Sequence, residues 1–358
     1  MTDAAIKPVL IMAGGTGGHI FPGLAVADEL KRSRTPVIWI GGIGGLEQQL
    51  VPQYGWKLET LPIAGVRGKG LVAKLTAPFR LARAVAAALA LFKRHMPQSV
   101  LSMGGYAAAP GGLAARLAKI PLVVHEQNRV PGMTNRMLQR FATRVLTGFA
   151  DAFPNAEWVG NPVRASIAAI AEPAARYADR EGPLRLLVLG GSQGAQSLNS
   201  ALPEVLRRRG TRLAVEVRHQ CGAKHFDQAR AAYMRANIEA DVVPFEDDMA
   251  RAYAWADLVI CRSGALTLAE LAAAGVPAIL VPFPHAVDDH QTRNAEAMVA
   301  AGGARLVVEG DDFVKRLGAA FEEIGDRAKL LRMAEAARSL AKPDAARRIA
   351  DICVEVAA

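Results

Sequence analysis

A loop of glycines that ends in histidine is the part of the sequence best suited to chemistry. It reads GGTGGH at 14–19 and follows an apolar run at 9–13. Backbone amides freed by glycines at the start of a helix make a good seat for a diphosphate. The imidazole of His19 could remove a proton from an attacking hydroxyl, and it could equally cap the loop or bind a phosphate. The loop fits neither G-x-G-x-x-G nor a P-loop, which disfavours a dehydrogenase or an ATPase.

Similar loops follow other apolar runs. Gly104 and Gly105 stand before Tyr106, the glycine-rich stretch GGSQG stands at 190–194, and CRSG at 261–264 leads into the helical pattern ALTLAELAAAG. Any one of these glycine loops could be a tight turn that binds no ligand. Three glycine-rich strand ends in one chain, at 14–19, 104–105 and 190–194, are not expected all to be empty turns. Glu270, in that helical pattern, could accept hydrogen bonds from ribose hydroxyls, whereas taken alone it would be an ordinary exposed helix glutamate.

His125 and Glu126, in HEQN at the end of another apolar run, are further candidates for acid–base chemistry. Metal binding has little support, because the chain has no Asp-x-Asp and its acidic pairs at 247–248, 288–289 and 311–312 stand where helices are expected to start. We therefore expect no metal and no cofactor. Helix N-termini and Arg would then stabilise a diphosphate leaving group.

The apolar runs alternate with Ala- and Leu-rich helical stretches, a pattern typical of parallel sheets. The predicted strands are 9–13, 36–40, 99–103, 121–125, 184–190, 213–219, 257–262 and 277–282. The sequence thus predicts an α/β protein with two similar doubly wound, Rossmann-like domains facing a cleft, with ligands outside the carboxyl ends of the strands. We expect an N-terminal domain at 1–162, a proline-containing linker at 163–183, a C-terminal domain at 184–342 and a C-terminal helix at 343–358.

The excess positive charge lies in the first half of the chain. The net charge is +9, and residues 1–162 hold 18 Lys and Arg against 8 Asp and Glu, whereas residues 163–358 hold 25 against 26. This excess of basic residues in one half of the chain predicts a polyanionic partner, such as anionic lipid or a phosphorylated substrate. Nucleic acid fits poorly, because only 6% of residues are aromatic and no binding motif is recognised.

Composition favours a soluble, cytoplasmic protein. Of the 358 residues 51% are apolar, yet no apolar run is long enough for a spanning helix and the start does not resemble a leader. The three cysteines, Cys221, Cys261 and Cys353, show no Cys-x-x-Cys pair, so we expect buried thiols.

A basic and apolar stretch at 66–95 is a candidate membrane surface. A helix is expected from Pro78, and the residues assigned to the surface are Lys69, Leu71, Lys74, Leu75, Phe79, Arg80 and Arg83. Each Lys or Arg near anionic headgroups adds about 1 kcal/mol of binding. An ordinary loop packed on its own domain is the alternative.

The chain resembles the MurG family of peptidoglycan N-acetylglucosaminyltransferases in blocks that keep the family's order from residue 10 to about 295. They are GGTGGHIFPGLAVADEL, GVRGKG, SMGGYAAAPGGLAA, HEQN, VGNPVR, LGGSQGAQSLN and DDMARAYAWADLVICRSGALTLAELAAAGVPAILVPFPHAVDDHQTRNA. The resemblance implies the GT-B architecture. It also implies inverting transfer of N-acetylglucosamine from UDP-N-acetylglucosamine to lipid I, undecaprenyl-diphosphate-MurNAc-pentapeptide, giving lipid II and UDP. The protein would act peripherally at the cytoplasmic face of the plasma (inner) membrane.

Matching motifs carry residue roles across. The donor would be bound by Thr16, Gly17, Gly18, Asn128, Arg164, Ser192, Glu246, Ala265, Leu266, Thr267, Leu268, Ala269, Glu270 and Gln291, and the acceptor by Gly14, Gly15, Gly104, Gly105 and Tyr106. His19 is the first choice for the catalytic base and Glu126 the second. Glu246 departs from the family's usual isoleucine, which is harmless if uracil meets only the backbone there and lowers uridine affinity if the side chain packs on the base.

Two other functions compete. Another GT-B enzyme, such as a glycolipid synthase or a UDP-sugar epimerase, would share the cleft, but an epimerase would not need the basic stretch. A catalytically silent membrane-associated protein that senses UDP-sugars would bind the donor without transferring it.

Overall fold

The computed structural model describes residues 6–64, 76–191, 194–209, 214–324 and 326–357. The chain divides into two compact units, residues 1–164 with 342–358, and residues 165–341. Each unit is built on its own sheet of parallel strands. The predicted fold class, two doubly wound parallel-sheet domains, is therefore confirmed.

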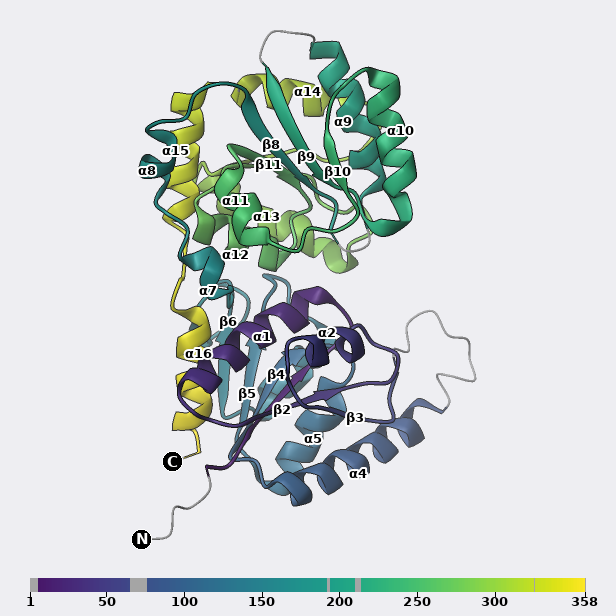
Figure 1. Ribbon diagram of the computed structural model, residues 1–358. Coiled ribbons are helices and arrows are strands. Elements are labelled where there is room, and N and C mark those ends of the chain that lie inside the picture. Colours follow the sequence, from purple (N-terminus) through teal and green to yellow (C-terminus); the bar gives the residue numbers. More distant parts are fainter. Residues whose placement is uncertain (1–5, 65–75, 192–193, 210–213, 325, 358) are drawn as a thin grey trace. The chain divides into compact units, whose positions relative to one another are not determined.

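The first unit contains a seven-stranded sheet in the order β3-β2-β1-β4-β5-β6-β7 (Figure 1). Leu10 in the central strand lies opposite Ile38 on one side and Val100 on the other. The strands are β1 (Val9–Ala13), β2 (Val37–Gly41), β3 (Leu58–Thr60), β4 (Ser99–Gly104), β5 (Leu122–Glu126), β6 (Arg144–Thr147) and β7 (Glu157–Trp158).

Helices cover both faces of this sheet, because successive strand residues point to opposite sides. Val9 and Ile11 pack into the core with α1 and α16, whereas Leu10 and Met12 pack into the core with α4 and α5. Strands buried on both faces explain the continuous apolar runs of the sequence. The helices are α1 (Gly17–Arg32), α2 (Glu47–Gln53), α4 (Ala77–His95), α5 (Ala108–Ala118), α6 (Met133–Leu138), η1 (Gln139–Phe141) and α16 (Ala345–Glu355).

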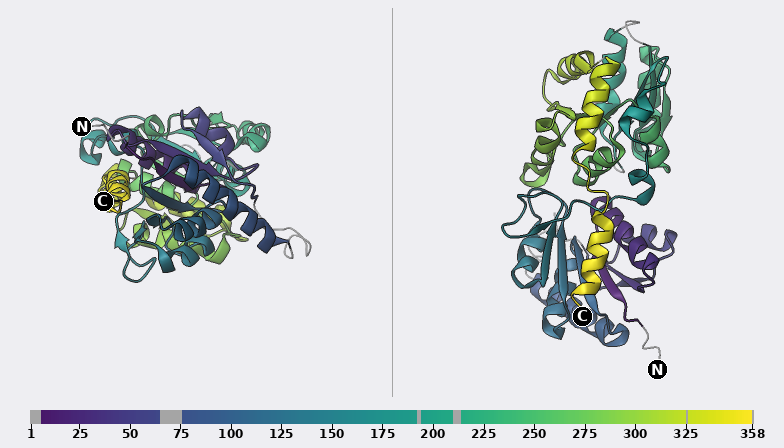
Figure 2. Two further views of the ribbon diagram at one scale, coloured as in Figure 1. Left: turned by 90° about the horizontal axis from the view of Figure 1, so that it is seen from below. Right: turned by 90° about the vertical axis from the view of Figure 1, so that its left-hand side faces the viewer.

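The last helix, α16, returns to the first unit and runs beside α1 (Figures 1 and 2). Its Ile349 and Ile352 are fully buried, and Ser99 Oγ donates a hydrogen bond of 2.5 Å to the Cys353 carbonyl. Burial of each isoleucine contributes about 1.5–3 kcal/mol. The C-terminal helix expected at 343–358 is thus an integral part of the first unit.

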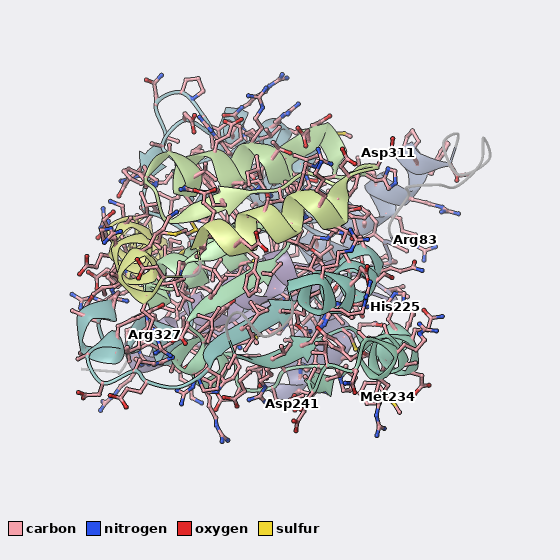
Figure 3. The ribbon with its side chains drawn as sticks, turned by 90° about the horizontal axis from the view of Figure 1, so that it is seen from above. Arg83, His225, Met234, Asp241, Asp311 and Arg327 are labelled. Carbon is pink, nitrogen blue, oxygen red and sulfur yellow. The ribbon has the colours of Figure 1, made fainter. Side chains whose placement is uncertain are left out.

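The second unit contains a six-stranded sheet in the order β10-β9-β8-β11-β12-β13. Its strands are β8 (Leu184–Leu189), β9 (Val215–Gln220), β10 (Asp241–Val243), β11 (Leu258–Cys261), β12 (Ala278–Leu280) and β13 (Ala304–Leu306). Its helices are α7 (Ala165–Ala168), α8 (Pro173–Tyr177), α9 (Gln196–Arg209), η2 (Ala223–His225), α10 (Phe226–Ala236), α11 (Met249–Trp255), α12 (Ala265–Ala274), η3 (Val287–Asp289), α13 (His290–Ala300), α14 (Phe313–Ile324) and α15 (Arg327–Arg338). Figure 3 shows Met234 of α10 and Asp241 of β10 at the edge of this unit.

The stretch expected to be a linker, 163–183, instead packs on the second unit from Ala165 onward. Arg176 of α8 donates a hydrogen bond of 2.8 Å to the carbonyl of Ala274 at the end of α12. Arg180 donates one of 2.5 Å to the Asp257 carboxylate. Prolines without a strand pattern suggested a linker, but Pro173 lies in the first turn of α8, where its missing N–H costs nothing.

The strand order of each sheet reverses beside its first strand, between β1 and β4 and between β8 and β11. Ligands of open parallel sheets bind outside the carboxyl ends of strands at such a switch point. The glycine loops after β1, β4 and β8 and the CRSG segment after β11 all lie there. The fold therefore brings together, within each unit, the loops that the sequence singled out.

Candidate active site

The loop after β1 opens α1 without a side-chain cap. Thr16, the residue before the helix, has an extended backbone (φ −133°, ψ 157°), and its hydroxyl makes no capping hydrogen bond. Its carbonyl accepts the amides of His19 and Ile20, at 3.1 and 3.2 Å. Thr16 and Gly18 are exposed. The N-terminus of α1 is therefore open to an anionic ligand.

A buried carboxylate that sequence analysis missed, Glu47 of α2, organises this loop. Its two oxygens accept the amides of Gly15 and Gly42, each at 2.9 Å, and the hydroxyl of Tyr106 at 3.1 Å. A Cβ on Gly14 would lie 2.5 Å from Glu47 Oε1, so only glycine fits there. Burial, and then Glu47, raises the pKa of Tyr106 to about 12. The Gly15 amide thus bonds within the protein, and the assignment of Gly15 to the acceptor stays a prediction.

His19 is linked to a buried chain of polar side chains. Its Nδ1 lies 2.9 Å from Gln127 Oε1. Gln127 Nε2 lies 3.0 Å from both Nδ1 and the carbonyl oxygen of His125, whose Nε2 lies 2.9 Å from the carbonyl oxygen of Gly160. His19 is half-buried, whereas Gln127 and His125 are buried. His125, which the sequence offered as a candidate for acid–base chemistry, is therefore not open to substrate.

Glu126 holds a loop rather than facing solvent. Its Oε1 accepts hydrogen bonds from the backbone amide and the side-chain amide of Asn128, at 2.9 and 3.3 Å. Its Oε2 accepts hydrogen bonds from the Gly132 amide at 3.1 Å and from Asn135 Nδ2 at 2.9 Å. Glu126 is 1% exposed. A carboxylate so fully engaged is poorly placed to take a proton from a substrate, which corrects its second place among the candidate bases. No pattern in HEQN distinguishes a loop-holding carboxylate from a catalytic one.

Because two histidines are buried, we expect the free energy of unfolding to fall in mild acid. Burial lowers the pKa of His125 from its ordinary 6.5 to about 4, and that of His219 in the second unit to about 3. Because the folded pKa lies below the unfolded one, the stabilisation is present above pH 6.5 and is lost as the pH falls toward 4. We expect protonation of His125 on unfolding to lower the free energy of unfolding by about 2 kcal/mol when the pH falls from 7 to 5. Urea unfolding at the two pH values measures it.

The control for that measurement is His125→Gln, which can still donate to the Gly160 carbonyl but does not titrate. The variant should lose less unfolding free energy than wild type between pH 7 and pH 5. Equal losses in the two proteins would show that His125 is not responsible.

Glu270 lies on α12 of the second unit and is only 6% exposed. Tyr253 of α11, itself fully buried, donates its hydroxyl to Glu270 Oε2 at 3.1 Å. The alternative of an ordinary exposed helix glutamate is therefore wrong, because α11 packs over this face of α12. Helix α12 begins after Gly264, which provides no side-chain cap. The hydroxyl of Ser263 is buried without a hydrogen-bond partner among the described residues.

Arg262, which the sequence did not select as a site residue, ties the loops of the second unit together. Its guanidinium donates to the Pro282 carbonyl at 3.0 Å, to Ser197 Oγ at 3.0 Å and to the Glu309 carboxylate, and it stacks 5.5 Å from the centre of the Phe283 ring. It therefore positions the loops after β11, β12 and β13 and the start of α9.

The remaining residues predicted to bind the donor are divided between the two units and lie in loops or in the first turns of helices. Arg164 stacks on Phe21 of α1 at 5.5 Å. Gln291 accepts the Phe283 amide at 2.9 Å, and Glu246 is buried, pairing with Arg218 at 2.9 Å. Gly17 and Gly18 begin α1, and Ala265, Leu266, Thr267, Leu268 and Ala269 form the first turns of α12. Ser192 lies outside the described residues.

The predicted acceptor residues of the β4 loop lie beside the α1 loop. A Cβ on Gly104 would lie 3.1 Å from His19 Cε1, and one on Gly105 would lie 2.3 Å from the Gly14 carbonyl oxygen. Thr134 donates its hydroxyl to the Gly105 carbonyl at 3.2 Å. The structure thus brings His19, the glycines of both loops and Tyr106 into one cluster.

Within the described ranges, no group of three or more His, Cys, Asp or Glu side chains is arranged to hold a metal ion. In the same part of the chain no helix is long and apolar enough to span a bilayer.

Comparison with known proteins gives two domain matches. The glycosyltransferase family 28 N-terminal domain matches residues 9–147, and the family 28 C-terminal domain matches residues 185–349. A protein of Xanthomonas campestris pv. campestris (strain 8004) is 58% identical over 355 residues, which cover 99% of this chain and 83% of that protein. Its name is UDP-N-acetylglucosamine--N-acetylmuramyl-(pentapeptide) pyrophosphoryl-undecaprenol N-acetylglucosamine transferase.

Solved structures agree with these matches. MurG of Acinetobacter baumannii is 40% identical, with a TM-score of 0.85 over 98% of this chain and 99% of that one. The UDP-GlcNAc 2-epimerase of Neisseria meningitidis, bound to UDP-GlcNAc, has a TM-score of 0.66 over 98% of this chain and all of that one, at 12% identity. At that identity the likeness concerns the fold alone.

Proposed function

The chain belongs to glycosyltransferase family 28, and from this membership we propose that it transfers N-acetylglucosamine from UDP-N-acetylglucosamine to lipid I, giving lipid II and UDP. One observation carries this function, the 58% identity over nearly the whole chain to the Xanthomonas enzyme of that name. Identity of this extent covers both sheets and every loop of the candidate active site. The residue roles below are our own assignment.

The second unit provides a site suited to a nucleotide diphosphate sugar. The N-terminus of α12 is open at Gly264, so its dipole and amides can stabilise the diphosphate, and the buried hydroxyl of Ser263 beside it needs a polar partner. Glu270, held by Tyr253, can accept hydrogen bonds from ribose hydroxyls. We assign the donor to this unit.

The first unit provides the base. The muramyl 4-hydroxyl oxygen attacks the anomeric carbon, the bond from that carbon to the UDP oxygen breaks, and UDP leaves with the electron pair. The hydroxyl proton passes to His19, which is half-buried beside the glycine loops. Attack opposite the leaving group inverts the anomeric configuration, as in inverting glycoside hydrolysis with an alcohol in place of water.

The test is an assay with radiolabelled UDP-N-acetylglucosamine and a water-soluble lipid I analogue. We expect labelled disaccharide product, with activity retained within about tenfold in EDTA, a limit that corresponds to roughly 1.4 kcal/mol of barrier. Absence of product with every lipid diphosphate, despite donor binding, would support the silent sensor. Epimerised UDP-sugar formed without acceptor would support an epimerase.

We also propose that α4 docks the enzyme on the cytoplasmic face of the plasma membrane. Phe79 is 80% exposed, Arg80 and Arg83 are exposed, and an apolar groove of about 550 Å³ lies between α4 and α5. Its lining includes Leu81, Val85, Leu113 and Leu117. Lys69, Leu71, Lys74 and Leu75, the other residues assigned to this surface, lie outside the described residues.

The membrane prediction concerns the triple variant Phe79→Asp, Arg80→Glu, Arg83→Glu. Since each basic residue contributes about 1 kcal/mol near anionic headgroups and Phe79 adds apolar contact, the variant should no longer sediment with anionic vesicles at low salt. It should react slowly with long-chain lipid I, yet normally with the soluble analogue.

The matched control changes α10 of the second unit, with Arg230→Glu, Met234→Asp and Arg235→Glu. Met234, which Figure 3 labels, is 72% exposed and both arginines are exposed, so the control makes the same change of charge at one apolar and two basic surface positions. This control should still bind vesicles. If both variants bind as wild type does, α4 is not the membrane face.

A further inference from the structure

We propose that Gln127 and His125 are positioning residues that hold His19 in one tautomer, with the hydrogen on Nδ1 and a free lone pair on Nε2. Nε2 is then the atom that accepts the proton of the attacking hydroxyl. The inference rests on the proposed function, in which His19 is the base, and it identifies what makes that histidine ready to act.

The amide orientation of Gln127 follows from its neighbours. One of its terminal atoms lies 3.0 Å from the backbone carbonyl oxygen of His125. A carbonyl oxygen can only accept, so that terminal atom must be the amide nitrogen, Nε2. The amide oxygen, Oε1, therefore faces His19 Nδ1 at 2.9 Å. Because an amide oxygen can only accept as well, Nδ1 of His19 carries the hydrogen.

His125 completes the chain at its buried end. Its Nε2 lies 2.9 Å from the Gly160 carbonyl oxygen and must donate to it, which leaves Nδ1 as an acceptor for the second hydrogen of the Gln127 amide, at 3.0 Å. The side chain is fully buried, and burial lowers its pKa to about 4, so it stays neutral and keeps this acceptor at neutral pH. Every polar atom of the Gln127 side chain is thereby satisfied.

The lack of a side chain at Gly104 leaves room for the His19 ring. Gly104 has φ +102°, and a Cβ there would lie 3.1 Å from Cε1 and 3.2 Å from Nδ1 of the imidazole. The ring therefore lies closely against this glycine with its Nδ1 edge turned inward toward Gln127. Nε2, the second ring nitrogen, is joined to Nδ1 through Cε1 and is not the atom that faces Gln127.

The carboxylate of Glu126, next to Gln127 in sequence, does not disturb this arrangement. Glu126 directs both oxygens to Asn128, Gly132 and Asn135. Proton transfer therefore converts neutral His19 into an imidazolium whose Nδ1–H strengthens its bond to the Gln127 oxygen, because a charged donor forms the stronger hydrogen bond. The proton remains on Nε2 until it is lost to solvent.

The direct test is the tautomer of His19 in the free full-length protein, read from the ¹⁵N chemical shifts of its two ring nitrogens above the histidine pKa. Wild type should show a protonated Nδ1 and an unprotonated Nε2. Gln127→Met, which keeps side-chain length but removes the acceptor, should shift the ring toward the Nε2–H form that free imidazole side chains prefer. A wild-type ring with its hydrogen on Nε2 would overturn the inference.

The kinetic test compares Gln127→Met with a matched control. Gln127→Met should lower kcat about tenfold, with the KM for donor within twofold, because the base is present but no longer held in the reactive tautomer. Gln53→Met, at an exposed glutamine of the same unit, is the control and should match wild type.

No loss of kcat in Gln127→Met would reduce Gln127 to a packing role and overturn the inference. Failure of the proposed function is a different result, because wild type itself would then make no product. The nitrogen shifts report the tautomer without any turnover.

Discussion

His19→Ala should lower kcat for transfer to a soluble lipid I analogue by about 10²–10⁴-fold, the usual contribution of a general base. Donor KM should stay within about twofold, because His19 acts on the acceptor hydroxyl and the nucleotide diphosphate is assigned to α12 of the other unit. His19 lies among the glycine loops after β1 and β4, and only its Nδ1 is directed at Gln127. Steady-state kinetics at saturating donor and acceptor measure the effect.

The control for this prediction is His95→Ala on α4, where the imidazole pairs with Glu59 at 3.0 Å outside the glycine loops. This variant should keep wild-type kcat. A His19→Ala enzyme with more than about a tenth of wild-type kcat would mean that another group removes the proton.

Glu270→Gln should raise the donor KM about tenfold, or about 1.4 kcal/mol of binding, because a neutral amide accepts ribose hydroxyls less strongly than a carboxylate does. It should leave acceptor KM unchanged. Glu270→Ala should raise donor KM further, by about 2–3 kcal/mol, and should also destabilise the second unit by about 1–3 kcal/mol, because the buried hydroxyl of Tyr253 loses its partner.

The conservative Glu270→Gln variant separates binding from folding, because an amide oxygen can still accept the Tyr253 hydroxyl. Its thermal midpoint should therefore lie close to that of wild type. Glu322→Gln, at an exposed glutamate of α14, is the control and should change neither quantity. An unchanged donor KM in Glu270→Gln would limit Glu270 to holding α11 against α12.

The sequence predicts the fold because its long strands are buried on both faces and so appear as continuous apolar runs. The predicted strand at 9–13 is found as β1, and the others begin or end within a few residues of the prediction. The short strands β3, β6, β7, β10 and β13 were missed, since two to four residues carry too little pattern to be recognised. The loops of the site could be predicted because apolar runs that end in glycine mark tight turns at the carboxyl ends of strands.

The interior polar residues of the site could not be predicted. Glu47, Gln127 and Arg262 act through contacts between loops that are distant in sequence, such as Glu47 with Gly15 and Tyr106. Local patterns say nothing about such pairings. For the same reason Glu126 was considered a second base, although its four hydrogen bonds assign it to its own loop.

The most direct test of the account is the anomeric configuration of the sugar linkage in the product made by wild-type enzyme from α-linked UDP-N-acetylglucosamine and a soluble lipid I analogue. We expect one UDP released for each sugar transferred, and a β-linkage to the muramyl 4-oxygen, read from the proton coupling of the new anomeric centre. An α-linkage, or UDP released without any disaccharide, would contradict single displacement by the muramyl hydroxyl with His19 as base.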